Sequence, residues 1–446
     1  MNTDLHLFCD EPIGPIKRMN AVNNGPAKAR SDQSRGNFDT YSAAGFPYAR
    51  THDANFCSAY GGPHTVDITA IFPDFDADEN DPASYDFFLT DLYMDTITQS
   101  GTKVFYRLGQ SIEHQPKKYG IFAPKDNAKW ARICEHIILH LNEGWANGHR
   151  FGIDYWEIWN EPDLDPDDSP NKRCWGGTKA QFFDLFEVAA KYLKGKFPQL
   201  KIGGPALAGN YEWAAEFLAE MHRREVPIDF FSWHRYGVDP HRIGELCEKY
   251  RALLNASGYP NAESILNEWN YVRNWDTQWV YSLRAECGQK GASFATAVMC
   301  ECQNRPLDML MYYDARLGTA MNGLFDLISL EPNKTYYPYL AFHQMAQLGR
   351  QVRLDFNDPD LYAIAASDGE KTHLLLTYYN DNDESPQREV TLRFRSKTRS
   401  DVTLYLTDRT RDNARVHVET ARVEEKGIRV PLKLFDIYHI VIEPRK

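Results

Sequence analysis

The chain of 446 residues lacks the features of several common protein classes. No apolar run approaches the length of a membrane-spanning helix, which argues against an integral membrane protein. Basic residues are in deficit: 50 Lys and Arg stand against 62 Asp and Glu, for a net charge of −12. This balance argues against nucleic acid or an anionic membrane as a partner. Internal repeats and low-complexity segments are also missing from the sequence.

We expect neither a signal peptide nor a disulfide framework. The first residues, MNTDLHLFCDEPIG, do not place a basic segment before a long apolar stretch, as a signal peptide does. The eight cysteines are scattered without a CxxC pair, and Cys300 and Cys302 stand too close together for an easy disulfide. We therefore expect reduced, mostly buried thiols in a cytoplasmic protein. The alternative is a secreted protein whose leader has been removed.

What the sequence does contain is a large apolar and aromatic fraction. Hydrophobic residues make up 43% of the chain and aromatic residues 13%, including 25 Tyr, 24 Phe and 10 Trp. Most of these side chains should pack in a core. Aromatic rings also stack on the apolar C–H faces of sugars, so the composition suits a carbohydrate ligand.

Strand-like and helix-like segments alternate up to about residue 345, which indicates a parallel sheet closed into a barrel. The expected strand ends lie near Arg18–Val22, Tyr48–Asp53, Lys103–Leu108, Tyr155–Glu161, Ile202–Ala206, Phe230–Tyr236, Ile265–Trp269 and Leu310–Asp314. Short alternating strands separated by turns follow. The predicted fold is α/β: a (β/α)8 TIM barrel over 15–350 and a C-terminal antiparallel β-sandwich over 351–446. Residues 1–14 should pack on the sandwich.

Two short motifs carry the chemistry. Trp159-Asn160-Glu161-Pro162 and Asn267-Glu268-Trp269-Asn270 each place a glutamate at the end of a buried strand. Two carboxylates at such strand ends can face each other across a barrel mouth. At a separation of about 5–5.5 Å, one acts as acid/base and the other as nucleophile in retaining glycoside hydrolysis.

Each glutamate also has a structural interpretation, as a strand-end acid in a salt bridge. The pairing of two specific motifs favours catalysis, with Glu161 as acid/base and Glu268 as nucleophile. Pro162 should hold Glu161 in extended geometry. Glu157, deeper in the same strand, is more plausibly a buried structural carboxylate paired with Arg50 or Arg107.

These motifs resemble glycoside hydrolase family 39, the β-xylosidase and α-L-iduronidase family. The resemblance rests on WNEPDL at 159–164, CW at 174–175, GGPA at 203–206, SWHRY at 232–236 and NEWN at 267–270. It implies the two catalytic roles above and a hydrogen bond from Asn160 to the sugar 2-hydroxyl. It also implies that His234 approaches the substrate and that Tyr236 orients the nucleophile.

Further substrate-binding residues are expected around this pair. Arg50 and His52 match a second-strand pattern at the bottom of the pocket, although the surrounding residues are not a close copy. Trp175 should form a wall of the sugar site, with a core aromatic as the alternative. The remaining candidates are strand-end residues: Trp269, Asp314 and Arg316.

The expected function is therefore a retaining exo-glycosidase that trims short oligosaccharides, with β-D-xylosides as the first expectation. Because the eighth strand departs from the xylosidase sequence, an α-L-arabinoside, galactoside or α-L-iduronide is the alternative substrate. A non-catalytic carbohydrate-binding barrel is the alternative from another class. We expect no cofactor and no metal, since the first strand lacks the H-x-H of metal-dependent barrels. A small carbohydrate is the expected partner, homo-oligomerisation is left open, and neither nucleic acid nor membrane is expected.

Overall fold

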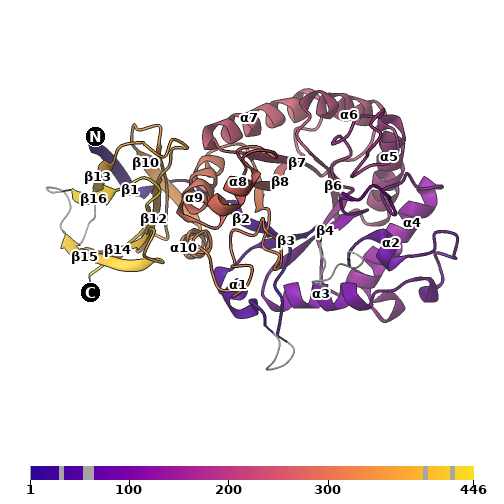
Figure 1. The fold of residues 1–446 in the computed structure, drawn as a ribbon, viewed down its shortest axis with the longest axis horizontal. Helices are drawn as coiled ribbons and strands as arrows, with labels where there is room; N and C mark the ends of the chain where they lie inside the picture. The colour runs from indigo at the N-terminus through magenta and orange to yellow at the C-terminus, as the bar shows by residue number, and fades with distance from the viewer. Residues whose placement is uncertain (1, 30–34, 54–64, 395–399, 422–426, 446) are drawn as a thin grey trace.

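The structure is a computed structural model, and it describes residues 2–29, 35–53, 65–394, 400–421 and 427–445. A closed barrel of parallel strands and a nine-stranded sheet lie side by side (Figure 1). The predicted fold class is confirmed. The barrel strands are β2 (Arg18–Asn23), β3 (Tyr48–Thr51), β4 (Lys103–Leu108), β5 (Tyr155–Ile158), β6 (Lys201–Leu207), β7 (Phe230–Gly237), β8 (Glu263–Tyr271) and β9 (Met309–Tyr312).

Helices surround the barrel (Figure 1), and several of them begin at a capping side chain. Thr178 and Gln181 form a capping box at the start of α5, and the Asp126 side chain caps α4. The α-helices are α1 (Phe38–Ala44), α2 (Ile68–Ile71), α3 (Phe88–Gln99), α4 (Asn127–Ile138), α5 (Lys179–Lys196), α6 (Tyr211–Arg223), α7 (Pro240–Ala256), α8 (Trp279–Glu286), α9 (Gln289–Gln303) and α10 (Tyr336–Ala346). Short turns are η1 (Pro82–Ser84), the π-helical η2 (Leu139–Glu143) and η3 (Trp145–Asn147).

The second sheet contains both ends of the chain. Its strands are β1 (Asn2–Pro15), β10 (Arg350–Asp355), β11 (Leu361–Ser367), β12 (Thr372–Tyr378), β13 (Arg388–Phe394), β14 (Ser400–Thr407), β15 (Ala414–Ala421), β16 (Ile428–Leu432) and β17 (Ile437–Pro444). All pairings are antiparallel except that of β1 with β13. Side chains from β14 and from β16, far apart in the strand order, share one hydrophobic core, so the sheet folds over on itself.

Barrel and sheet meet through polar contacts as well as packing. Asp381, in the loop after β12, accepts hydrogen bonds from Tyr271 Oη at 2.7 Å and Arg273 Nη2 at 3.1 Å. Lys290 Nζ of α9 lies 2.8 Å from the same carboxylate. These contacts attach the sheet next to the end of β8, the strand that carries Glu268.

Inside the barrel, side chains form layers because strand residues alternate between two faces. One layer is apolar and forms its own small cluster, which includes Tyr48, Phe105, Tyr155, Phe230 and Ile265. Two residues further along each of the same strands, the side chain is polar: Arg50, Arg107, Glu157, Ser232 and Asn267. This polar layer lies directly beneath the candidate site.

Candidate active site

Glu157 and Arg50 are the centre of the polar layer, and both are fully buried. Glu157 accepts hydrogen bonds from Arg50 Nε at 2.6 Å, Ser232 Oγ at 2.6 Å and Asn267 Nδ2 at 2.5 Å. Of the two expected partners of Glu157, the structure brings Arg50 to it. A buried carboxylate with three donors and a neighbouring cation is satisfied, so Glu157 is a structural residue.

Arg50 connects this layer to both glutamate-containing motifs, at 159–162 and 267–270. Its Nη1 donates to Glu268 Oε1 at 2.8 Å, and its Nη2 donates to Asn160 Oδ1 at 2.7 Å. Arg50 therefore lies beneath the pocket and positions other side chains. Because the Asn160 carbonyl oxygen is taken by Arg50, its amide nitrogen is the group left to donate to a ligand.

Glu268 lies on β8 among hydrogen-bond donors. Besides Arg50, Tyr236 Oη donates to Glu268 Oε2 at 2.8 Å, and His52 Nε2 lies 3.7 Å from Oε1. Burial raises the pKa of Glu268, whereas His234 and Arg50 act in the opposite direction. Two direct donors, one of them a guanidinium, favour the charged form that a nucleophile requires.

Glu161 occupies a different environment, just beyond the end of β5. Its backbone φ of 46° lies in the left-handed region, so the expectation of extended geometry before Pro162 is wrong. Such strain at a non-glycine residue persists only where the surrounding structure enforces it. Burial is the main cause that raises the pKa of Glu161 to about 7, and Asp53 adds to it while Arg50 opposes it. Near pH 7 this carboxyl can therefore hold or release a proton.

Trp159, two residues earlier, shows how tightly this turn is packed. Gly109, with φ of 120°, lies against the Trp159 ring, and a Cβ at residue 109 would come within 2.8 Å of it. A side chain at position 109 would clash with the Trp159 ring, which follows β5. Glycine is therefore required at this position after β4.

His234 lies between the two glutamates. Its Nδ1 is 2.7 Å from Glu161 Oε1 and 3.4 Å from Glu268 Oε2. Burial lowers the pKa of His234 to about 4, so the ring is neutral at pH 7. One oxygen of each carboxylate and a ring nitrogen of His234 lie within 4.8 Å of one another. The same three atoms are of the types that bind metal ions.

These residues open into a pocket of about 490 Å3 at the carboxyl-terminal ends of the strands. Glu161, Glu268, Tyr236 and His52 line it. The long loops after β4 and β5 supply further walls: Ile112, His114, Leu164 and Arg173. Ligand sites of (β/α)8 barrels lie at this end of the strands.

Two predicted sugar contacts are wrong, because the side chains face the protein core. Trp175 is 4% exposed and packs edge-on against Trp159 at 5.0 Å between ring centroids. Its indole nitrogen donates to the Thr178 carbonyl at 2.8 Å. Trp269 is fully buried and packs against Tyr312 at 5.3 Å. Both are core aromatics, and neither lines the pocket.

Asp314 and Arg316 are near the site but do not line the pocket either. Asp314 is fully buried, and burial raises its pKa to about 6. Arg316 Nε is 3.5 Å from Asp314 Oδ2, and its Nη1 donates to the Asp53 carbonyl. The structure thus makes both residues supports of the pocket rim.

Several pocket residues were missed by reasoning from the sequence. Tyr313 lines the pocket and donates to Asp53 Oδ2 at 3.1 Å. Trp275, 60% exposed, stands at the wall with its ring 5.0 Å from that of Tyr236. Cys174 Sγ is 3.7 Å from Glu161 Oε2. Tyr313 follows the last barrel strand, a signal that was available, whereas Trp275 lies in a loop without a pattern. Cys174 belongs to the CW pair at 174–175, but no role was predicted for it, and it does not line the pocket.

Fold and site together define a class: a (β/α)8 barrel with two neighbouring carboxylates in a pocket at the strand ends. The sequence model of glycosyl hydrolases family 39 matches residues 42–249. A beta-xylosidase of Geobacillus stearothermophilus is 24% identical over 312 residues, which are 62% of this chain and 56% of that protein. A beta-xylosidase of Caldicellulosiruptor saccharolyticus is 28% identical over 335 residues, 67% of this chain and 64% of that protein. Residues 42–249 are thus similar to glycoside hydrolase family 39, the family that the sequence motifs resemble.

The chain thus spans less than two thirds of the length of these two relatives. Among solved structures, a glucosidase from Croceicoccus marinus superimposes with a TM-score of 0.82 at 22% identity, covering 100% of both chains. This likeness shows that the barrel and the sheet belong to one shared fold. In the described part of the chain, no helix has both the length and the apolar character needed to cross a membrane.

Proposed function

We propose that the protein is a retaining exo-glycoside hydrolase in which Glu161 is the acid/base and Glu268 the nucleophile. The observation that carries this proposal is the approach of the two carboxylates, which His234 bridges and whose nearest oxygens lie within 4.8 Å. Retaining enzymes hold their carboxyl groups about 5–5.5 Å apart, whereas inverting enzymes need room for a water between them.

The two environments support opposite roles for the two acids. Glu268 accepts hydrogen bonds from Arg50 and Tyr236, which stabilise a carboxylate ready to attack the anomeric carbon. Glu161 has a pKa of about 7, so a substantial fraction is protonated at neutral pH. With His234 neutral, its Nδ1 can accept a hydrogen bond from protonated Glu161, which keeps the proton until the leaving oxygen takes it.

In the first step the Glu268 oxygen bonds to the anomeric carbon as the glycosidic bond breaks, and the Glu161 proton moves to the leaving oxygen. In the second step Glu161 takes a proton from water, whose oxygen displaces Glu268. We expect the Asn160 amide to donate to the 2-hydroxyl, a contact that would strengthen as positive charge develops on the sugar ring.

An exo mode of action follows from the walls of the pocket. The loops after β4 and β5 rise around the site, and a volume of about 490 Å3 suits a small ligand rather than a polymer. β-D-Xylosides are the first expected substrate, since the two relatives described above are named beta-xylosidases. Arg173 and Arg235 on the wall are cations that a uronate carboxylate could meet, which makes an α-L-iduronide the second candidate.

Turnover of a panel of aryl glycosides tests the sugar: xyloside, glucoside, galactoside, arabinosides, glucuronide and iduronide. NMR of the anomeric proton in the first minutes should show the retained product. Glu268→Ala should be inactive and rescued by azide, and Glu161→Ala should keep activity only on substrates with good leaving groups. An inverted first product, or equal losses in both variants without any azide effect, would contradict the proposal. Rapid loss of viscosity of a xylan solution would contradict the exo mode.

A further inference from the structure

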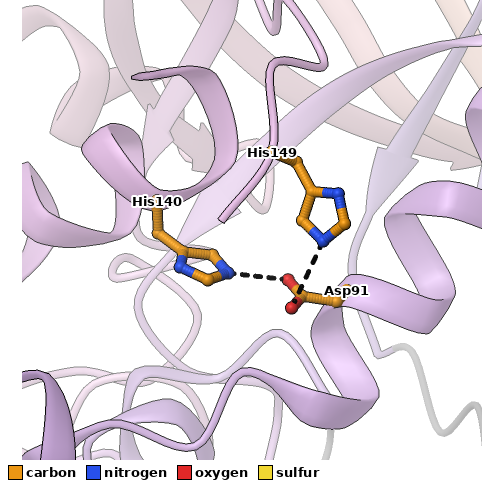
Figure 2. Close-up of side chains that lie close together, drawn as sticks. All are labelled: Asp91, His140 and His149. Atoms are coloured by element: carbon orange, nitrogen blue, oxygen red, sulfur yellow. Dashed lines mark hydrogen bonds and ion pairs between the residues drawn. The ribbon is translucent and has the colours of Figure 1, made fainter. Parts of the chain in front are cut away.

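A second cluster of metal-binding side chains lies away from the pocket. Asp91 in the first turn of α3, His140 in η2 and His149 in the loop before β5 point toward one another (Figure 2). The Asp91 carboxylate is 2.9 Å from His140 Nε2 and 3.4 Å from His149 Nε2. The three ligand atoms lie within 4.8 Å of one another.

His140 has an unusual set of partners. It is 2% exposed, and its Nδ1 lies 2.8 Å from the Trp145 carbonyl oxygen, which can only accept. Nδ1 must therefore carry a proton, and Nε2 is left facing an Asp91 carboxylate that also only accepts. Either a second proton or a metal ion must lie between them. Metal-binding histidines commonly donate their other ring N–H to a backbone carbonyl in this way.

The backbone holds the two histidines in a fixed relation. His149 N donates to the His140 carbonyl at 2.7 Å, an approach that Gly148 permits, since a Cβ there would lie 2.1 Å from that oxygen. The rings are fixed by stacking: His140 on Phe87 at 3.5 Å and His149 on Phe151 at 4.5 Å. His140 also lies in a π-helical turn, a feature frequent at functional sites.

We propose that Asp91, His140 and His149 form a binding site for a divalent transition-metal ion, Zn2+ being the best match. Two imidazoles and one carboxylate with an open fourth position are a zinc ligand set. Bonds of about 2.0–2.1 Å in a tetrahedron separate the ligand atoms by roughly 3.3 Å. Here Asp91 Oδ1 lies 2.9 Å from His140 Nε2, and the other carboxylate oxygen, Oδ2, lies 3.4 Å from His149 Nε2. The His149 side chain, 36% exposed, provides the entry path. The ion would join α3 to the segment that leads into β5, the strand after which Asn160 and Glu161 follow.

Zn2+ titration of the chelator-treated protein tests the site. The wild type should bind one equivalent, and Zn2+ should raise its melting temperature. His149→Ala and Asp91→Asn should each weaken this binding roughly tenfold or more and remove the thermal shift. His417→Ala is the matched control, because His417 is also an exposed histidine 3.4 Å from a carboxylate oxygen. This control should bind Zn2+ like the wild type.

The catalytic trio could also bind the ion, so the titration is repeated with Glu161→Gln. Retention of the Zn2+ site in Glu161→Gln and its loss in His149→Ala would support the proposal. Loss in Glu161→Gln with unchanged binding in His149→Ala would overturn it. So would the absence of saturable binding to the wild type, which would mean that Asp91 and His140 form only a carboxylate–imidazolium pair.

Discussion

Glu161→Gln should change stability and activity in opposite directions, each in a defined pH range. The folded protein raises the pKa of this carboxyl from 4.5 to about 7. At about 1.4 kcal/mol per unit, ionised Glu161 costs about 3 kcal/mol of folding free energy. The sign follows from linkage: between pH 4.5 and 7 the folded state holds a proton that the unfolded state has released, so stability falls as pH rises.

Glutamine has nearly the same shape but no charge to bury. The free energy of unfolding of Glu161→Gln should therefore equal that of the wild type near pH 4 and exceed it by up to about 3 kcal/mol at pH 8. Melting temperatures measured across this range would show the difference widening with pH. Glu384→Gln, at an exposed position, is the control and should track the wild type.

Activity should show the opposite trend. Wild-type kcat/KM on substrates with poor leaving groups should fall above pH 7, about tenfold per unit, as Glu161 loses its proton. Glu161→Gln should be slow at all pH values, and its kcat/KM should not show the fall above pH 7. Two results would refute the reasoning. One is a difference in melting temperature between Glu161→Gln and the wild type that does not change with pH. The other is a kcat/KM of the variant that still falls above pH 7.

The remaining predictions concern side chains around this pair. Tyr236→Phe removes the 2.8 Å hydrogen bond to Glu268 and should lower kcat about tenfold or more while KM changes little, as steady-state kinetics would show. Arg50→Met leaves two buried carboxylates without their cation, so it should destabilise the fold by about 3–5 kcal/mol in denaturant unfolding; a smaller loss would mean that Arg50 is dispensable. Trp275→Ala removes an exposed wall of the pocket and should raise KM for oligosaccharides more than for aryl glycosides. Equal effects on both substrates would argue against a sugar-stacking role.

Local pattern was enough to predict the barrel, because each of its elements carries its own signal. Short apolar runs mark the strands, and the structure has a strand at each predicted position, such as Phe230–Gly237 (β7) where Phe230–Tyr236 was predicted. Some ends differ, since β5 ends at Ile158 rather than at Glu161. The nine-stranded sheet was predicted as antiparallel, and its one parallel pair, β1 with β13, joins segments almost 400 residues apart. No local pattern encodes such a pairing.

At the site, the sequence determined which residue types stand at the strand ends, and tertiary structure decided what each one contacts. Glu161 and Glu268 were predicted from their motifs, but their approach depends on barrel closure. Trp269 was misassigned although alternation places it on the face opposite Glu268. Trp275 and the Asp91–His140–His149 cluster are brought to their positions by loops and turns. Strand periodicity is a property of the chain itself, whereas the path of a loop depends on everything that packs around it.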